Sequence, residues 1–182
     1  MESRIVKHII PRKYFWTKGA GESDLSHDPG SYHKALYDAE ISGLNISLYS
    51  STMPKEAQEI SIDESKILHG EQKSLIQSRV NVRKDETGIA GIILGWLYDF
   101  GSQERLKGFV CEIKGDVERC VVYSSKQDAE NFLRTSLKEM YQNHMEEGYM
   151  LEDMIVTQSI TSKKEYGTAI VAICFDDHTH LE

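Results

Sequence analysis

Apolar residues recur at helical spacing in two parts of the chain. The first set predicts a helix that begins near Ser31, because its members lie on one face of a 3.6-residue repeat. In the second part, Ser125 has the form of a helix N-cap with the acidic Asp128 three residues on, and Gly148 closes the segment. The apolar positions are Tyr32, Ala35, Leu36 and Ala39 in the first helix, and Ala129, Phe132, Leu133, Leu137, Met140 and Tyr141 in the second.

Other segments show the patterns of strands. Residues 45–49 alternate between apolar and polar side chains, and this predicted strand ends in the serine-rich turn 50–54. The continuous apolar run 169–175 is typical of a strand buried on both faces. Residues 19–24 place glycines in a polar stretch and are predicted to form a loop. Further strands are expected at 14–17, 74–82, 89–98, 108–114 and 155–161.

The order of these elements predicts the fold class. Strands occur before, between and after the two helices, without the regular strand–helix–strand alternation of a parallel sheet. The length of 182 residues fits one domain spanning residues 1–182. We therefore expect an α+β fold, an αββα-type layered sandwich in which helices cover mostly antiparallel sheets.

The charge of the chain bears on its partners. It carries 21 Lys and Arg residues against 29 Asp and Glu residues, a formal net charge of −8. This scattered negative charge argues against nucleic acid or an anionic membrane as a partner, and a small cationic ligand suits its sign better.

The cysteines and the absence of long apolar runs bear on location. Cys111, Cys120 and Cys174 show no CxxC spacing and cannot all pair with one another, which favours a reducing compartment. The sequence shows no signal peptide and no apolar run near the ~20 residues of a membrane span. We expect a cytoplasmic protein.

Several common catalytic and metal motifs are absent from the sequence. It contains no ordered serine triad, no Walker glycine loop and no HExxH. His178 and His180 lie beside Asp176 and Asp177, but at the extreme terminus, where disorder is common. We therefore predict no native metal site.

One short segment stands out after the predicted strand 45–49. It reads Ser50-Ser51-Thr52-Met53-Pro54-Lys55-Glu56. Taken alone, it is typical of a serine-rich turn that leads to a proline. Other short segments in the same chain change that interpretation, and they are Gly21-Glu22-Ser23, Ala35-Leu36, Asn45, Gly108-Phe109-Val110-Cys111-Glu112 and Tyr166-Gly167-Thr168-Ala169.

Together these segments resemble the pyruvoyl-dependent arginine decarboxylase family, in which a Ser-Ser-x-x-Pro-x-Glu cleavage site follows a strand that carries an asparagine. The similarity spans nearly the whole chain and occurs in the same order. It implies that the Ser51 hydroxyl attacks the Ser50 carbonyl carbon, so that the amide becomes an ester. β-Elimination and hydrolysis then give chains 1–50 and 51–182, with a covalent pyruvoyl cofactor derived from Ser51.

The resemblance also implies roles for two further residues. Asn45 is expected to donate a hydrogen bond to the Ser50 carbonyl during the attack. Because side chains alternate along a strand, the offset of five residues requires a bend near Tyr49 to bring the two together. Glu112 is expected to supply the proton after carbon dioxide leaves the substrate.

The expected substrate pocket departs from the family pattern. The resemblance implies substrate contacts from His33 and from the segment that contains Ser42 and Leu44, but the family has an acidic residue where this chain has His33. A histidine is a poor partner for a guanidinium group. The family also assembles as trimers with active sites between protomers, so a homotrimer or a dimer of trimers is expected.

Three functions remain open at this point. The first is a self-processing decarboxylase that converts arginine to agmatine and carbon dioxide. The second is the same chemistry on a different amino acid, because of His33. The third is a non-catalytic homologue that folds without cleaving, since fold alone does not guarantee activity.

Overall fold

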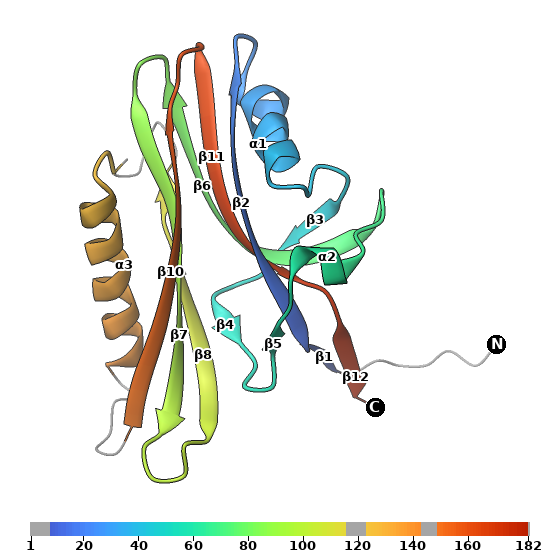
Figure 1. Ribbon diagram of the computed structural model, residues 1–182, viewed down its shortest axis with the longest axis vertical. Helices are drawn as coiled ribbons and strands as arrows, with labels where there is room; N and C mark the ends of the chain where they lie inside the picture. The colour runs from blue at the N-terminus through green and yellow to red at the C-terminus, as the bar shows by residue number, and fades with distance from the viewer. Residues whose placement is uncertain (1–7, 116–122, 143–148, 182) are drawn as a thin grey trace, which may run out of the picture.

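A computed structural model describes residues 8–115, 123–142 and 149–181. Two sheets face each other across the molecule, as Figure 1 shows. The larger sheet contains β3 (Asn45–Leu48), β6 (Gln72–Arg83), β11 (Tyr166–Phe175), β2 (Lys13–Ser23) and β5 (Gln58–Glu59) in that order, and β9 (Lys114–Gly115) pairs with β6. The smaller sheet has the order β10 (Tyr149–Thr161), β7 (Thr87–Asp99), β8 (Arg105–Glu112) and β4 (Thr52–Met53).

Helices cover the outer faces of both sheets. The longest helix, α3 (Lys126–Tyr141), lies against β7 and β8, while α1 (Tyr32–Asp38) lies against β2 and β11 on the opposite side (Figure 1). The short α2 (Ile62–Ser65) contacts β2, and β1 (His8–Pro11) pairs with β12 (His178–Leu181) near the two ends of the chain. Most strand pairs are antiparallel, so the expected α+β sandwich of αββα type is confirmed.

The apolar residues divide into two cores, one on each side of the larger sheet. Strand β11 belongs to both, because its side chains alternate between the two faces. Ala169, Val171 and Ile173 enter the core between the sheets, whereas Ile170 and Ala172 enter the core beneath α1. All of them are fully buried, which confirms the prediction of a strand buried on both faces.

The second helix begins as its sequence predicts. The Ser125 hydroxyl accepts a hydrogen bond from the Asp128 backbone N–H at 3.5 Å, which is the N-cap contact. Leu133, Leu137 and Tyr141 are buried on the inner face of the helix. The predicted closing residue, Gly148, lies outside the described residues, as does Cys120.

The predicted loop at 19–24 is wrong, because β2 continues to Ser23. The glycines there serve helix packing rather than a turn. A Cβ added to Gly21 would lie 2.5 Å from the backbone nitrogen of Ala35 and 2.5 Å from the carbonyl oxygen of Ser31, and one added to Gly19 would also meet the backbone of Ala35. Glycine is needed in β2 because the backbone of α1 lies directly on the strand.

The structure also bears on membranes and disulfides. None of the helices in the described part of the chain is long and apolar enough to cross a bilayer. Cys111 and Cys174 are both buried free thiols.

Candidate active site

The Ser50–Ser51 peptide bond lies where the chain crosses from one sheet to the other. Just before it, the N–H of Tyr49 donates to the carbonyl of Leu75 in the larger sheet at 2.8 Å. Just after it, the carbonyl of Ser51 accepts a hydrogen bond from the N–H of Val110 in the smaller sheet at 2.9 Å, and β4 then pairs with β8. The two sheets therefore hold this bond from either side.

The Ser50 carbonyl accepts a backbone hydrogen bond. Its donor is the N–H of Thr52, at 3.0 Å, so the bond closes a tight turn around Ser51. A donor at this oxygen polarises the carbonyl and stabilises negative charge that develops there. The sequence did not point to Thr52, because any residue except proline can supply a backbone N–H.

Glu112 is the polar partner of Ser51. It is the last residue of β8, and its side chain is only 8% exposed. One carboxylate oxygen, Oε2, accepts a hydrogen bond from Ser51 Oγ at 3.2 Å. The other, Oε1, lies 2.9 Å from the ammonium of Lys114. The structure thus brings the two predicted residues together and adds Lys114, to which sequence reasoning gave no role.

Both residues of the Ser50–Ser51 bond border open space. A hollow of about 360 Å³ opens beside Ser51 and Glu112, and its remaining wall is formed mainly by apolar side chains of β8 and α3. Its lining residues are Ser51, Val110, Cys111, Glu112, Lys114, Phe132 and Met140. A second hollow of about 390 Å³ borders Ser50 and is lined by Ile10, Pro11, Leu48, Tyr49, Ser50, Thr52 and Pro54.

Cys111 forms part of the wall of the first hollow and is not suited to nucleophilic chemistry. Its thiol lies 3.0 Å from the Met140 sulfur. Burial, helped by the neighbouring charge of Glu112, raises the pKa of the Cys111 thiol to about 11. It therefore stays protonated near neutral pH, whereas the thiolate is the reactive form.

The structure does not bring Asn45 to the Ser50 carbonyl. Its side-chain amide donates to the Gly70 carbonyl at 2.8 Å, and its backbone N–H donates to the Glu71 carbonyl. Strand β3 is regular from Asn45 to Leu48, so at ~3.3 Å per residue its extended backbone leads away from Asn45 by about 10 Å before the chain reaches Ser50. The bend expected near Tyr49 does not reverse this separation, because Tyr49 still bonds to β6.

The expected substrate contacts lie in another part of the chain. His33 is an exposed residue of α1, and Ser42 and Leu44 are half-buried in the link between α1 and β3. Within the described residues, none of the three lines the hollow at Ser51. Residue 51 and the residues expected to contact the substrate are thus apart within one chain.

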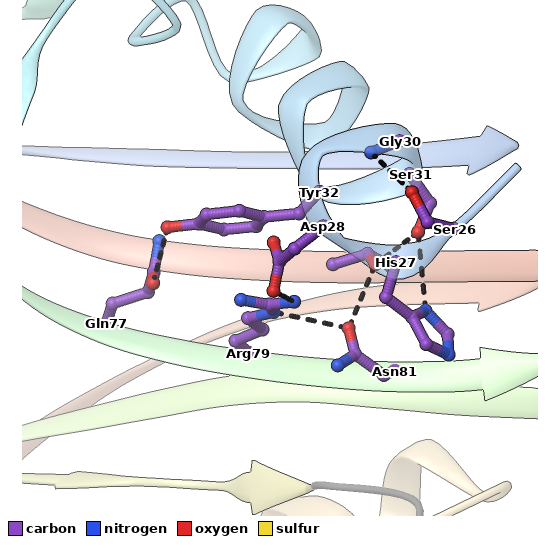
Figure 2. Close-up of polar contacts among 10 residues, drawn as sticks. Ser26, His27, Asp28, Gly30, Ser31, Tyr32, Gln77, Arg79 and Asn81 are labelled. Atoms are coloured by element: carbon purple, nitrogen blue, oxygen red, sulfur yellow. Dashed lines mark hydrogen bonds and ion pairs between the residues drawn. The ribbon is translucent and has the colours of Figure 1, made fainter.

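A polar cluster binds the start of α1 to the larger sheet. His33 is the second residue of this helix, so the cluster also fixes the position of the backbone that carries it. Figure 2 shows the side chain of Asp28 reaching toward Arg79 and that of Tyr32 reaching toward Gln77, both on β6. Arg79 pairs with Asp28 at 2.6 Å, and its guanidinium carbon lies 4.0 Å from the centre of the Tyr32 ring. Beneath them the buried hydroxyls of Ser31 and Thr168 are 2.7 Å apart.

Comparison with known families adds one match. The family model described as pyruvoyl-dependent arginine decarboxylase matches residues 13–180, which is nearly the whole chain. A search of curated proteins finds no match.

Proposed function

The chain belongs to the pyruvoyl-dependent arginine decarboxylase family, and from this membership we propose that it cuts itself between Ser50 and Ser51 and then decarboxylates an amino acid. One observation carries the proposal. The Ser51 hydroxyl lies 3.2 Å from Glu112 Oε2, and the adjacent Ser50 carbonyl already accepts a hydrogen bond from Thr52. Ser51 can therefore act as the nucleophile, and Glu112 on the facing strand β8 can accept its proton. The carbonyl to be attacked, that of Ser50, is polarised by the N–H of Thr52.

The cleavage chemistry follows from these groups. Ser51 Oγ bonds to the Ser50 carbonyl carbon, and the bond from that carbon to the Ser51 nitrogen breaks, which leaves an ester and a free amine. Loss of the Ser51 α-proton then breaks its Cβ–Oγ bond, so Ser50 departs as a carboxylate that keeps Oγ. Water replaces the nitrogen of the remaining dehydroalanine, and ammonia leaves. Residue 51 thereby becomes the pyruvoyl group.

The residues around Ser51 fit such a group. A pyruvoyl carbonyl supplies an electron acceptor that condenses with the amine of a substrate. Glu112 borders the same hollow and is the acid that returns a proton after carbon dioxide leaves. The apolar side chains of Val110 and Phe132 line the same hollow.

Arginine is the substrate that family membership implies, and the region around His33 favours a second candidate. The carboxylate of Asp28 is already paired with Arg79, and that of Asp38 accepts a hydrogen bond from the Ala20 N–H at 2.9 Å. A substrate guanidinium near His33 would have to compete for these acids. This observation supports the same decarboxylation chemistry on an amino acid other than arginine.

The test begins with the intact mass of the purified protein under denaturing, reducing conditions. We expect fragments 1–50 and 51–182, the second lighter by the elements of ammonia than a chain that starts with serine. Ser51→Ala removes the nucleophile and should stay whole. A wild-type chain that stays whole through long incubation would favour the non-catalytic homologue. Once cleavage is established, carbon dioxide release from a panel of amino acids separates arginine from the alternative.

A further inference from the structure

Among the described residues, the buried carboxylate of Glu112 contacts Ser51 and Lys114, and the proposed self-cleavage removes the first of these contacts. When Ser50 departs as a carboxylate it takes Oγ, so residue 51 no longer offers a hydroxyl to Glu112 Oε2. Of the two contacts to this carboxylate, the ion pair with Lys114 at 2.9 Å remains. A carboxylate that is only 8% exposed is costly to leave without a partner.

The backbone on either side of the Glu112–Lys114 pair is bound to both sheets. Ile113, between them, is buried, and its N–H donates to the Gly91 carbonyl at 2.9 Å. Lys114 is the first residue of β9, which pairs in parallel with β6 opposite Arg79. Glu112 lies opposite Ile92 of β7 in the smaller sheet, so the two residues of the pair are anchored in strands of different sheets. The pair is therefore held by the backbone as well as by charge.

The exposure of Lys114 separates its role from core packing. Its side chain is 72% exposed, so its removal leaves no cavity in the core, while its ammonium reaches the Glu112 oxygen that does not face Ser51. An ammonium on Oε1 fixes the rotation of the carboxyl group and keeps Oε2 directed toward residue 51.

We propose that Lys114 is a positioning residue, whose ammonium keeps the Glu112 carboxyl directed at residue 51 after the Ser51 hydroxyl has been lost. This inference rests on the proposed function. It predicts an asymmetry between the two stages. Cleavage depends little on Lys114, because the Ser51 hydroxyl still orients Glu112. Turnover depends on it strongly, because that hydroxyl is gone.

The asymmetry is measured with Lys114→Met, Lys114→Arg and a matched control, Lys126→Met. Lys126 is also 72% exposed and pairs with a glutamate, Glu130, but on the helix α3. We expect Lys114→Met to cleave within about threefold of the wild-type rate, by intact mass, and to lower kcat on the order of 100-fold with KM nearly unchanged. Lys114→Arg should recover most of kcat, and Lys126→Met should match the wild type.

A second measurement needs no activity. In the Ser51→Ala background, which lacks the same hydroxyl but stays uncut, Lys114→Met should lower the unfolding temperature by about 4 °C more than Lys126→Met does. In chains that keep Ser51 and are measured before they cleave, the difference should be smaller, because Glu112 still has its hydroxyl partner.

Several results would overturn the proposal. An unchanged kcat in Lys114→Met would show that the ion pair is passive, and a raised KM with normal kcat would make Lys114 a substrate contact instead. Equal slowing of cleavage and turnover would remove the asymmetry. A wild-type chain that never cuts itself contradicts the proposed function, whereas equal unfolding temperatures in the Ser51→Ala background contradict the role of Lys114 alone.

Discussion

Lys73, on β6, has the most buried side chain of the lysines in the described part of the chain. It is 3% exposed, and its ammonium lies 2.9 Å from Glu71 and 2.7 Å from Asp176. Ser65 of α2 also donates to Asp176, at 2.5 Å. Lys73 is paired with Ile46 of β3, the strand that leads to the cleavage site. These contacts join β6, α2 and the end of β11 close to that strand.

The carboxyl of Asp176 makes this cluster sensitive to acid. Burial alone would raise its pKa, but the hydrogen bonds from Lys73 and Ser65 outweigh burial, and the pKa of Asp176 is lowered. A carboxyl whose pKa is lower in the folded state adds stability above its unfolded pKa of about 3.9, and that stability is lost as the pH falls through the folded value.

We predict that Asp176→Asn lowers the free energy of unfolding by about 3 kcal/mol at neutral pH, because it leaves the buried ammonium of Lys73 with one carboxylate fewer. In urea titrations the difference from the wild type in the free energy of unfolding should narrow as the pH falls from the unfolded pKa of about 3.9 through the lower folded pKa, where Asp176 in the folded protein becomes neutral. Asp63→Asn, at an exposed position, is the control. A difference in the free energy of unfolding between Asp176→Asn and the wild type that stays constant at every pH would contradict a stabilising role for the ionised Asp176 carboxylate.

Sequence reasoning reached Ser51 and Glu112 because their residue types and order match a family pattern. It missed two other groups for physical reasons. The Thr52 donor is a backbone N–H, which leaves no mark on residue type. The proposed role of Lys114 depends on its ion pair with Glu112, and residue type alone does not show that the two side chains meet. Asn45 had the expected residue type, but the structure places its amide on Gly70.

Among the elements, β2 shows most clearly what local patterns leave out. Glycines in a polar stretch are ordinarily loop signals, and on that basis the strand was expected to end before Gly19. Its continuation depends on β11, which pairs with β2 as far as Ser23, and on α1, which needs a strand without side chains beneath it. The strands β7 and β11 were predictable, because their long apolar runs reflect the burial of both strand faces.

Gly21→Ala tests this packing of α1 on β2. The added Cβ would meet backbone atoms of Ser31 and Ala35, which cannot move without shifting the helix. We expect a loss of about 1–3 kcal/mol in the free energy of unfolding, measured by chemical denaturation.

Gly101→Ala is the matched control, since an added Cβ there meets only a side-chain oxygen of Asp99 at 3.5 Å. Self-cleavage should persist in the folded fraction of Gly21→Ala, because the Ser50–Ser51 bond lies at the crossing between the sheets rather than beneath α1. Equal stability of the two variants would show that α1 can move away from β2 at little cost.

At the scale of the whole molecule, cleavage between Ser50 and Ser51 would give two fragments that both contribute strands to the larger sheet. Fragment 1–50 would contribute β2, which lies between β11 and β5 in the larger sheet, together with β3 at the edge of that sheet. The rest of that sheet and all of the smaller one would come from fragment 51–182. The two fragments therefore share a sheet and a core, and we expect them to stay together in native buffer after the bond is cut.

The separation of residue 51 from His33, Ser42 and Leu44 within one chain supports the proposal that neighbouring copies complete each site, in a homotrimer or a dimer of trimers.

Co-expression of two inactive variants tests whether neighbouring copies share a site. Ser51→Ala cannot form the pyruvoyl group, and His33→Trp, at an exposed helix position, should block the substrate side. Each variant alone should be inactive. In mixed oligomers some sites would combine an intact residue 51 from one copy with an intact His33 from its neighbour, so part of the activity should return. Mixed oligomers, verified by native mass, that stay inactive would place each site within a single chain, and an active His33→Trp variant would remove His33 from the substrate side.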